Sequence, residues 1–246
     1  SVADKAGNGI DASHNVQVDL HAPVITVGKV AGDDIININE HSQAQVISGS
    51  VTGGKAGNNV VVTLAGKTYS TVLDAAGNWS VGVPASVIAG LQDGSVSIAV
   101  TVTDSAGNVG STTHDIKVDT GLPTLSINTI AGDDIINSTE KGQDITISGQ
   151  ATGLTSGATV TVNLNGQQYT ATVDDKGQWS TVVPAADVAN LGEAIYSVTA
   201  SATNDVGNNI STVHAITVGT QTPLVTINTV AGNDVINASE LAAGQT

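Results

Sequence analysis

One segment occurs three times in the sequence at an offset of 100 positions, and this repetition constrains the fold more than any other feature. The segment Val30-Ala-Gly-Asp-Asp-Ile-Ile-Asn-Ile-Asn-Glu40 returns as Ile130–Glu140 and again as Val230–Glu240. Self-similarity at a fixed period is typical of repeat architectures. A period of this length gives each copy enough chain to bury its own hydrophobic core, so we expect autonomous tandem domains.

The domain boundaries follow from the same offset. Aligning 23–122 with 123–222 needs no gap and gives about 40 identities, so these ranges are predicted to be two complete copies of one domain. Residues 1–22 are then the C-terminal tail of a preceding copy, and 223–246 are the start of a following copy. Because the sequence does not begin with Met, we expect it to be a piece of a longer chain.

The composition favours strands over helices. The chain of 246 residues holds 28 Gly and is rich in Thr, Ser, Asn and Val, which suit short strands joined by tight turns. In the first copy, apolar or alternating runs lie at about 24–28, 44–49, 59–64, 67–73, 79–83, 95–103 and 111–118. About seven strands in each copy predict an all-β fold of tandem β-sandwich domains, with a small barrel as the alternative.

A turn motif followed by Trp occurs once in each copy. Asp74-Ala-Ala-Gly-Asn-Trp79 corresponds to Asp174-Asp-Lys-Gly-Gln-Trp179. A Gly three positions after the acidic residue, as at Gly77 and Gly177, is typical of a hairpin turn. We expect each Trp to fill the core of its sandwich. A sugar-binding Trp is the alternative.

The charge excludes one class of function and favours another. With 22 Asp and Glu against 7 Lys and a net charge of −15, the chain lacks the basic surface that nucleic acids require. The absence of Cys removes disulfides and thiolate metal sites, and no apolar run is long enough to enter a membrane. An acidic surface of this kind suits cations.

Carboxylates concentrate in the repeated segment, where three acidic residues lie within ten positions. Carboxylates this close repel one another unless a cation lies among them, and calcium fits best because it accepts six to eight irregular oxygen ligands. The alternative is a solvated turn whose acids serve solubility. The predicted ligands from the segment are Asp33, Asp34 and Glu40 in the first copy and Asp133, Asp134 and Glu140 in the second.

The up-and-down order of strands predicts where further ligands lie. The first loop and the C-terminus of a sandwich lie at one end, and the loop between the sixth and seventh strands lies at the other. The Asp33 loop, the exit residue Asp119 and the next copy's loop with Asn204 and Asp205 are therefore expected to converge on one junction. Asp19 and Asp104 are expected to meet in the same way at the preceding junction. Calcium there would stiffen the short, Pro-terminated connections.

The second copy departs from this pattern. Asn204 stands where the first copy has Asp104, Gly219 stands where it has Asp119, and Asn233 in the third segment replaces Asp33. Because calcium affinity follows the number of charged ligands, we expect weaker binding near the exit at 219–223.

The combined motifs V-A-G-D-D-x-I-N-x-x-E, D-x-x-G-x-W-S and V-T-D-x-A-G-N-x-S-x-x-H resemble the bacterial immunoglobulin-like repeats of giant adhesins. These adhesins, including those of Salmonella and other biofilm-associated proteins, are secreted by type I systems to the bacterial cell surface. The resemblance covers the whole chain and implies immunoglobulin-like domains arranged end to end as a rod, with calcium at the junctions. It implies extracellular spacer repeats that project an adhesive tip toward host cells or a biofilm.

The resemblance implies that the acidic positions listed above bind calcium, with neighbouring repeats of the same chain as partners. No nucleophile elbow, phosphate loop or zinc motif occurs, so we expect no enzyme activity and no catalytic residue. The alternative function is a module whose Thr- and Ser-rich strand faces themselves bind a glycan or a surface.

Overall fold

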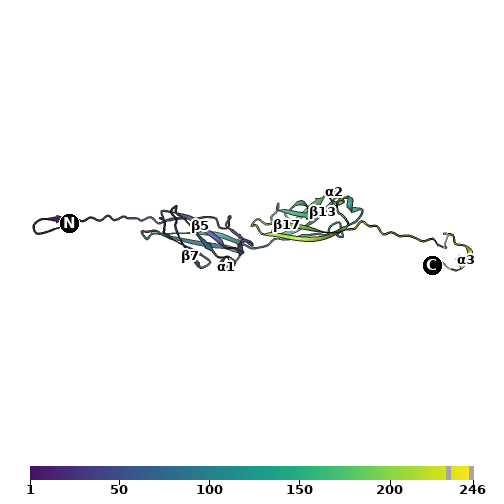
Figure 1. Cartoon of the computed structure of the whole chain (residues 1–246), viewed down its shortest axis with the longest axis horizontal. Coiled ribbons are helices and arrows are strands. Elements are labelled where there is room, and N and C mark those ends of the chain that lie inside the picture. Colours follow the sequence, from purple (N-terminus) through teal and green to yellow (C-terminus); the bar gives the residue numbers. More distant parts are fainter. Residues whose placement is uncertain (231–233, 244–246) are drawn as a thin grey trace. The chain divides into compact units, whose positions relative to one another are not determined.

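The computed structural model describes residues 1–230 and 234–243, and within these ranges most regular structure is β-strand (Figure 1). The chain forms two compact units. Unit 1 comprises Ser1–Thr124 together with Thr152–Thr155 and Thr203–Ile210, and unit 2 comprises Leu125–Ala151, Ser156–Ala202 and Ser211–Thr246.

Two sheets build the first copy, one of five strands in the order β4-β10-β9-β6-β7 and one of three in the order β3-β5-β8. The strands are β3 (Val24–Val27), β4 (Ile35–Asn37), β5 (Gln45–Thr52), β6 (Asn59–Leu64), β7 (Lys67–Val72), β8 (Asn78–Val83), β9 (Gly94–Thr103) and β10 (Val109–Asp119). The predicted all-β sandwich is confirmed, and each of the seven predicted runs forms a strand.

The eighth strand, β4, was not predicted. It lies in the acidic segment and pairs in parallel with the end of β10, with Ile36 opposite Val118 and Asn37 opposite Asp119. Ile36 is fully buried. The run is only three residues long and its partner lies about eighty positions later, so no local pattern of alternation marks it as a strand.

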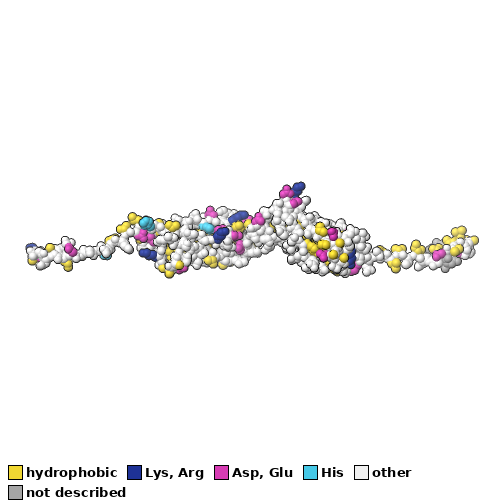
Figure 2. All heavy atoms as spheres, turned by 90° about the horizontal axis from the view of Figure 1, so that it is seen from above, with side chains coloured by type: hydrophobic (Ala, Val, Ile, Leu, Met, Phe, Trp, Pro, Cys, Tyr) yellow, Lys and Arg dark blue, Asp and Glu magenta, His cyan; other side chains and the backbone are white. Residues whose placement is uncertain are grey.

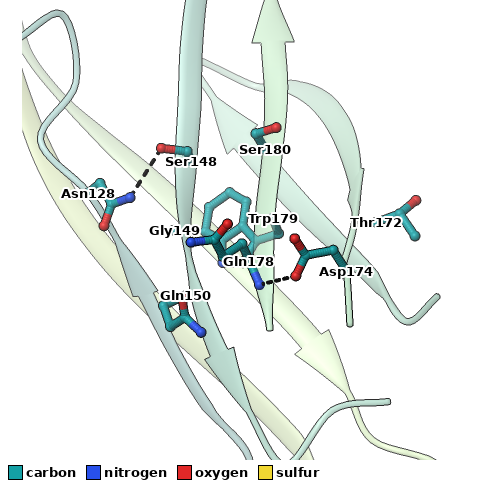
Figure 3. Close-up of a pocket in the computed structure, with 9 residues that line it drawn as sticks. All are labelled: Asn128, Ser148, Gly149, Gln150, Thr172, Asp174, Gln178, Trp179 and Ser180. Carbon is teal, nitrogen blue, oxygen red and sulfur yellow. Dashed lines mark hydrogen bonds between the residues drawn. The ribbon is translucent and has the colours of Figure 1, made fainter. Parts of the chain in front are cut away.

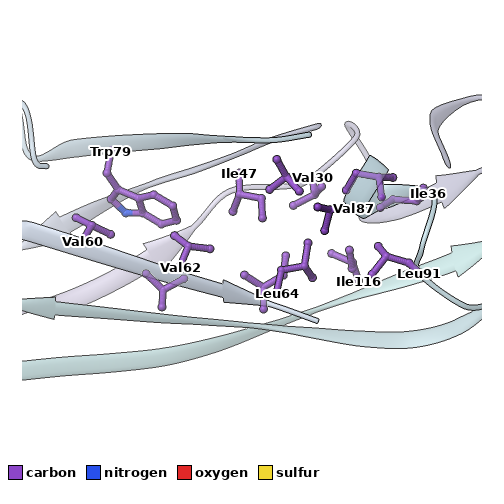
Figure 4. Packing of buried hydrophobic residues seen from close by; sticks show 14 of the residues in the cluster. Val30, Ile36, Ile47, Val60, Val62, Leu64, Trp79, Val87, Leu91 and Ile116 are labelled. Carbon is purple, nitrogen blue, oxygen red and sulfur yellow. The ribbon is translucent and has the colours of Figure 1, made fainter. Parts of the chain in front are cut away.

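The two sheets enclose one hydrophobic core, in which strands bury every second residue (Figure 4). In β9, Ile98, Val100 and Val102 are fully buried and the residues between them are more exposed. Trp79 is 3% exposed and lies among residues from both sheets, which confirms that it fills the core. The indole lies over Gly49 of the neighbouring strand, where a Cβ would come 2.8 Å from Trp79 Cζ2.

Short helical turns complete the first copy. The 3-10 turn η1 (Glu40–Ser42) follows β4, and α1 (Ala85–Ile88) follows Pro84, whose fixed φ suits the residue before a first helical turn. Val87 and Ile88 of α1 are buried in the core.

The same topology returns in the second copy, with sheets β12-β18-β17-β14-β15 and β11-β13-β16. Its elements are β11 (Thr124–Ile127), β12 (Ile135–Ile136), η2 (Glu140–Gly142), β13 (Ile145–Thr152), β14 (Thr159–Leu164), β15 (Gln167–Thr172), β16 (Gln178–Val183), α2 (Ala185–Ala189), β17 (Ala194–Thr203) and β18 (Asn209–Val218). Trp179 is 2% exposed, as expected for a core residue.

The segments outside the two copies carry little regular structure. Near the N-terminus, β1 (Val2–Ala3) and β2 (Gly9–Ile10) form a small antiparallel hairpin, and α3 (Ala238–Ala243) lies near the C-terminus. No helix in the described part of the chain has the length and apolar character needed to span a membrane.

Equivalent tyrosines of the two copies have different partners. The Tyr169 hydroxyl donates to Asp187 Oδ2 at 2.9 Å, and burial together with this carboxylate raises the pKa of Tyr169 to about 12. Val87 stands at the position of Asp187 in the first copy, and the buried Tyr69 hydroxyl has no hydrogen-bond partner within the described residues.

This difference predicts opposite effects of the same substitution. Tyr69→Phe should stabilise the protein by up to about 1 kcal/mol because it removes an unpaired buried hydroxyl, whereas Tyr169→Phe should destabilise it by about 1 kcal/mol. Urea unfolding of the two variants measures both values. Equal effects of the two changes would contradict the difference in partners.

Candidate functional site

Four hydrogen bonds hold Asp34 to its own loop and to β10. Its Oδ1 lies 2.8 Å from His114 Nε2 of β10 and accepts the Val30 amide at 2.9 Å, while its main-chain N–H and C=O bond to Val30 and Lys117. The residue has a positive φ of 72°, which is uncommon outside Gly. Partial burial opposes ionisation, but the bonds from His114 and Val30 outweigh it and lower the pKa of Asp34.

Asp134 repeats this arrangement in the second copy. Its Oδ1 lies 2.7 Å from His214 Nε2 and accepts the Ile130 amide at 2.8 Å, and its carbonyl accepts from Thr217. The Ile130 and His214 bonds lower the pKa of Asp134. We call this four-bond arrangement at Asp34 and at Asp134 the loop lock.

Asp33 and Glu40 are bound to main-chain amides close by in sequence. Asp33 Oδ1 accepts the Ile35 amide at 2.9 Å, and Glu40 Oε2 accepts the Asn37 amide at 3.1 Å. Asn37 Oδ1 accepts the Glu40 amide in return, which is the reciprocal pattern of a capping box. Asp133 and Glu140 make the corresponding bonds to Ile135 and Asn137.

Asp104 belongs to a turn that occurs five times among the described residues. Its Oδ1 accepts the amides of Ala106 and Asn108 at 2.9 and 2.8 Å, its Oδ2 accepts from Asn108 Nδ2, and Gly107 has a positive φ of 92°. These bonds, the Asn108 side chain first, lower the pKa of Asp104. The other four turns begin at Asp4, Asp74, Asp174 and Asn204.

Asp119 ends β10 beside a pocket of unit 1. Its Oδ2 lies 2.8 Å from Lys117 Nζ. The bond from Lys117, together with a weaker one from the Gly121 main-chain N–H, lowers the pKa of Asp119. The pocket is lined by Lys117, Asp119, Gly153, Asn204, Asp205 and Val206. Two predicted ligands, Asp119 and Asp205, thus line one pocket.

The remaining predicted ligand, Asp19, has its Oδ1 bound to the His21 amide at 3.2 Å, while its carbonyl accepts from Asn108 Nδ2. Asp19 and the turn of Asp104 are therefore in contact through Asn108, without a direct bond between the two carboxylates. Asn233, which entered the expectation for the exit at 219–223, lies outside the described residues.

The chemistry of the Asp119 pocket fits a hard cation, since it offers two carboxylates and the amide of Asn204. Within the described residues, however, no three or more His, Asp or Glu side chains are grouped so as to hold one metal ion. Asp34 Oδ1 is used by Val30 and by His114 of β10, both oxygens of Asp104 are used within their own turn, and Lys117 occupies one oxygen of Asp119.

Sequence reasoning missed one residue in this region. Asn208 is 0% exposed, and together with Asp104 it is one of two buried polar or charged residues in the described chain. The sequence does mark Asn208 as a turn residue, because Asn closes the same five-residue turn at Asn8, Asn78 and Asn108. Its long-range partners could not be read from the sequence.

A second pocket lies on the three-stranded sheet of unit 2 and bears on the glycan alternative (Figure 3). Asn128 Nδ2 donates to Ser148 Oγ, and Asp174 Oδ1 accepts the Gln178 amide. Trp179 Nε1 has no partner within the described residues, but neither has Trp79, so this is a feature of both cores rather than of the pocket. The buried Trp179 presents no open ring face on which a sugar could stack.

Figure 2 shows the side chains on one face of each unit. On the face shown in Figure 2, acidic side chains are spread over both units, and most of the surface is neither charged nor hydrophobic. Hydrophobic side chains gather in one area of unit 2 on this face (Figure 2).

Comparison with known proteins agrees with the fold. Residues 23–120 match the family model of the bacterial Ig-like domain. A structure described as a Ca2+-stabilized adhesin that helps an Antarctic bacterium bind ice is 36% identical, covering 98% of this chain and 61% of that chain, with a TM-score of 0.59. A structure from a 1.5-MDa bacterial ice-binding adhesin is 36% identical, covering 81% and 65%, with a TM-score of 0.56.

A single bacterial immunoglobulin-like domain from the M. primoryensis ice-binding adhesin is 38% identical, covering 40% of this chain and 98% of that chain, with a TM-score of 0.33. A search of curated proteins finds no match. The chain spans less than two thirds of the two longer adhesin structures.

Residues 23–120 belong to the bacterial Ig-like domain family, whose model they match. More specifically, the chain consists of tandem repeats of the kind found in bacterial adhesins. Such repeats are structural domains, and the chain is not an enzyme.

Proposed function

We propose that the chain is a spacer of a large bacterial surface adhesin, in which 23–122 and 123–222 are complete repeats and 1–22 and 223–246 belong to flanking repeats. In this proposal the repeats form an extracellular rod that carries an adhesive module toward a host cell or a biofilm. Secretion by a type I system belongs to the same proposal.

The observation that carries this proposal is the gapless repetition of a whole sandwich, combined with 36% identity to an adhesin structure over 98% of this chain. A domain that is copied with its core, turns and loop locks intact adds length in regular steps. Spacing is a function that depends on length alone, and it needs no catalytic group in any copy.

We propose further that calcium binds at the connections between repeats. The matched adhesin described as Ca2+-stabilized supports this, as do the carboxylates of Asp119 and Asp205 on one pocket. These two side chains would hold the ion with oxygens of Asn204 and of the main chain, and Asp33 and Glu40 of the first copy are further candidates there. Asp19 is a candidate ligand at the preceding connection, where its carbonyl accepts from Asn108. The bound ion would neutralise carboxylates that otherwise repel one another.

Calcium should then raise the free energy of unfolding. If the dissociation constant is on the order of 0.1 mM, as in extracellular modules, 10 mM calcium gives about 2.7 kcal/mol relative to chelator. The double variant Asp119→Asn, Asp205→Asn should lose most of this increment in thermal unfolding. The matched control Asp115→Asn, Asp175→Asn removes two exposed charges elsewhere and should keep it.

Small-angle scattering of the whole chain tests the rod itself. The scattering profile is expected to show a longer and more rigid particle in calcium than in EGTA. An unchanged profile would remove calcium from the proposal and would leave the spacer role. Saturable binding of the chain on a glycan array would instead replace the spacer role with the binding-module alternative.

A further inference from the structure

We propose that the Asn closing the turn between the last two long strands of each repeat is a metal-independent clasp. Its side-chain amide binds a main-chain carbonyl at the exit of the preceding repeat, 89 positions earlier. Asn208 is the complete form of this clasp, and Asn108 is a simpler form. Every residue that carries the proposal lies in unit 1.

The side chain of Asn208 uses all its polar groups in bonds to distant main chain. Its Nδ2 donates to the carbonyls of Asp119 at 2.9 Å and of Gly121 at 3.0 Å. Its Oδ1 accepts the Ile38 amide at 2.8 Å, across 170 positions of sequence. Because the residue is 0% exposed, these three bonds replace water completely.

The same contact occurs a second time with the same spacing. Asn108 Nδ2 donates to the Asp19 carbonyl at 3.1 Å, so in both places the Asn closing the turn reaches the carbonyl of the exit residue. Asn78 closes an identical turn within the first copy, yet its Nδ2 donates only to Asp74 at 3.4 Å. The turn alone therefore does not create the contact, and Asn78 is a natural matched control.

The replacement of Asp104 by Asn204 strengthens the clasp. In the turn of Asp104, one donor of Asn108 is used on Asp104 Oδ2 at 3.0 Å. In the second copy, Asn208 directs its Nδ2 to Asp119 and Gly121 instead, and Asn204 Nδ2 adds a bond to Gly121 at 3.4 Å. A substitution that removes a potential calcium ligand thus supplies a hydrogen-bond donor at the same exit.

The clasp differs in chemistry from the proposed calcium site. It consists of neutral amide and carbonyl groups, so it needs no ion and salt does not screen it. It concerns the same exit segment as the calcium proposal but does not depend on it. A chelator distinguishes the two, because it removes calcium and leaves amides unchanged.

The test is amide hydrogen exchange of Ile38, measured by NMR on the whole chain in EGTA and in calcium. Protection of Ile38 in EGTA is expected, and Asn208→Ala should lower it about tenfold in both conditions. Asn78→Ala should leave Ile38 unchanged. An Ile38 amide that exchanges freely in EGTA in the original chain, or that keeps its protection in Asn208→Ala, would overturn the clasp.

Asn208→Asp keeps the proposal testable if the Ala variant does not fold. It retains an acceptor for Ile38 but replaces the donor with a charged oxygen that faces the carbonyls of Asp119 and Gly121. We expect faster exchange of Ile38 in EGTA than in the original chain. Unchanged exchange would show that the two carbonyl bonds contribute nothing, and the proposal would fail.

Discussion

Gly49→Ala should destabilise the protein by about 3 kcal/mol or more, because the added methyl group has no space. A Cβ at this position would overlap the Thr26 carbonyl oxygen and would lie 2.8 Å from Trp79 Cζ2. Thr26 belongs to the paired strand β3, so its main chain cannot move away without loss of the sheet. A domain of about 100 residues should then lose about 12 °C or more in Tm.

Thermal unfolding followed by circular dichroism measures this effect, and Gly82→Ala is the matched control. Gly82 lies in β8 of the same sheet, and a Cβ there would meet no atom within 4 Å. Gly149→Ala should reproduce the loss in the second copy, where a Cβ would overlap the Ser126 carbonyl oxygen. Similar Tm values for Gly49→Ala and Gly82→Ala would contradict the packing of Trp79 on Gly49.

Asp34→Ala should destabilise the protein by about 2 kcal/mol, because it leaves the Val30 amide and the His114 ring without their carboxylate partner. The loss should be the same in calcium and in EGTA if the loop lock is the role of Asp34. Asp115→Ala is the matched control, since Asp115 is exposed, lies next to His114 in β10 and is not a proposed calcium ligand. A loss for Asp34→Ala that appears only in calcium would instead identify Asp34 as a calcium ligand.

The destabilisation caused by Asp34→Ala should depend on pH. The folded state lowers the pKa of Asp34, so the stability from its ionised form is present above the unfolded value of about 3.9 and is lost as the pH falls through the lower folded value. The Tm difference between the original chain and Asp34→Ala should therefore shrink below about pH 4. A difference that stays constant from pH 7 to pH 3 would contradict an ionised loop lock.

Much of the fold could be predicted because its signals are local. The seven predicted strands follow from alternation and turn residues, and the Gly of each Asp-x-x-Gly turn marks a positive φ, as at Gly77. The burial of Trp79 and Trp179 follows from the small number of aromatic residues available to fill a sandwich. These features depend on the residues themselves and their nearest neighbours.

The acidic segment shows where such reasoning ended. The proximity of its carboxylates in sequence predicts calcium binding, and this stays a prediction for Asp33, Asp34, Glu40 and their equivalents. The structure adds that Asp34 accepts from His114, 80 positions away, and that β4 pairs with the end of β10. Proximity in sequence could not reveal these partners, because each comes from a different strand.

The sequence by itself determined that this protein is a series of equal all-β domains, because a period of 100 residues and the alternation of apolar residues are properties of the chain. Only the tertiary structure decided which polar groups meet. Asn208 and Ile38 are separated by 170 positions, and the hydrogen bond between them exists because folding removes both groups from water at the same place. Each buried polar group then requires a partner, and the geometry of the sheets determines which one it finds.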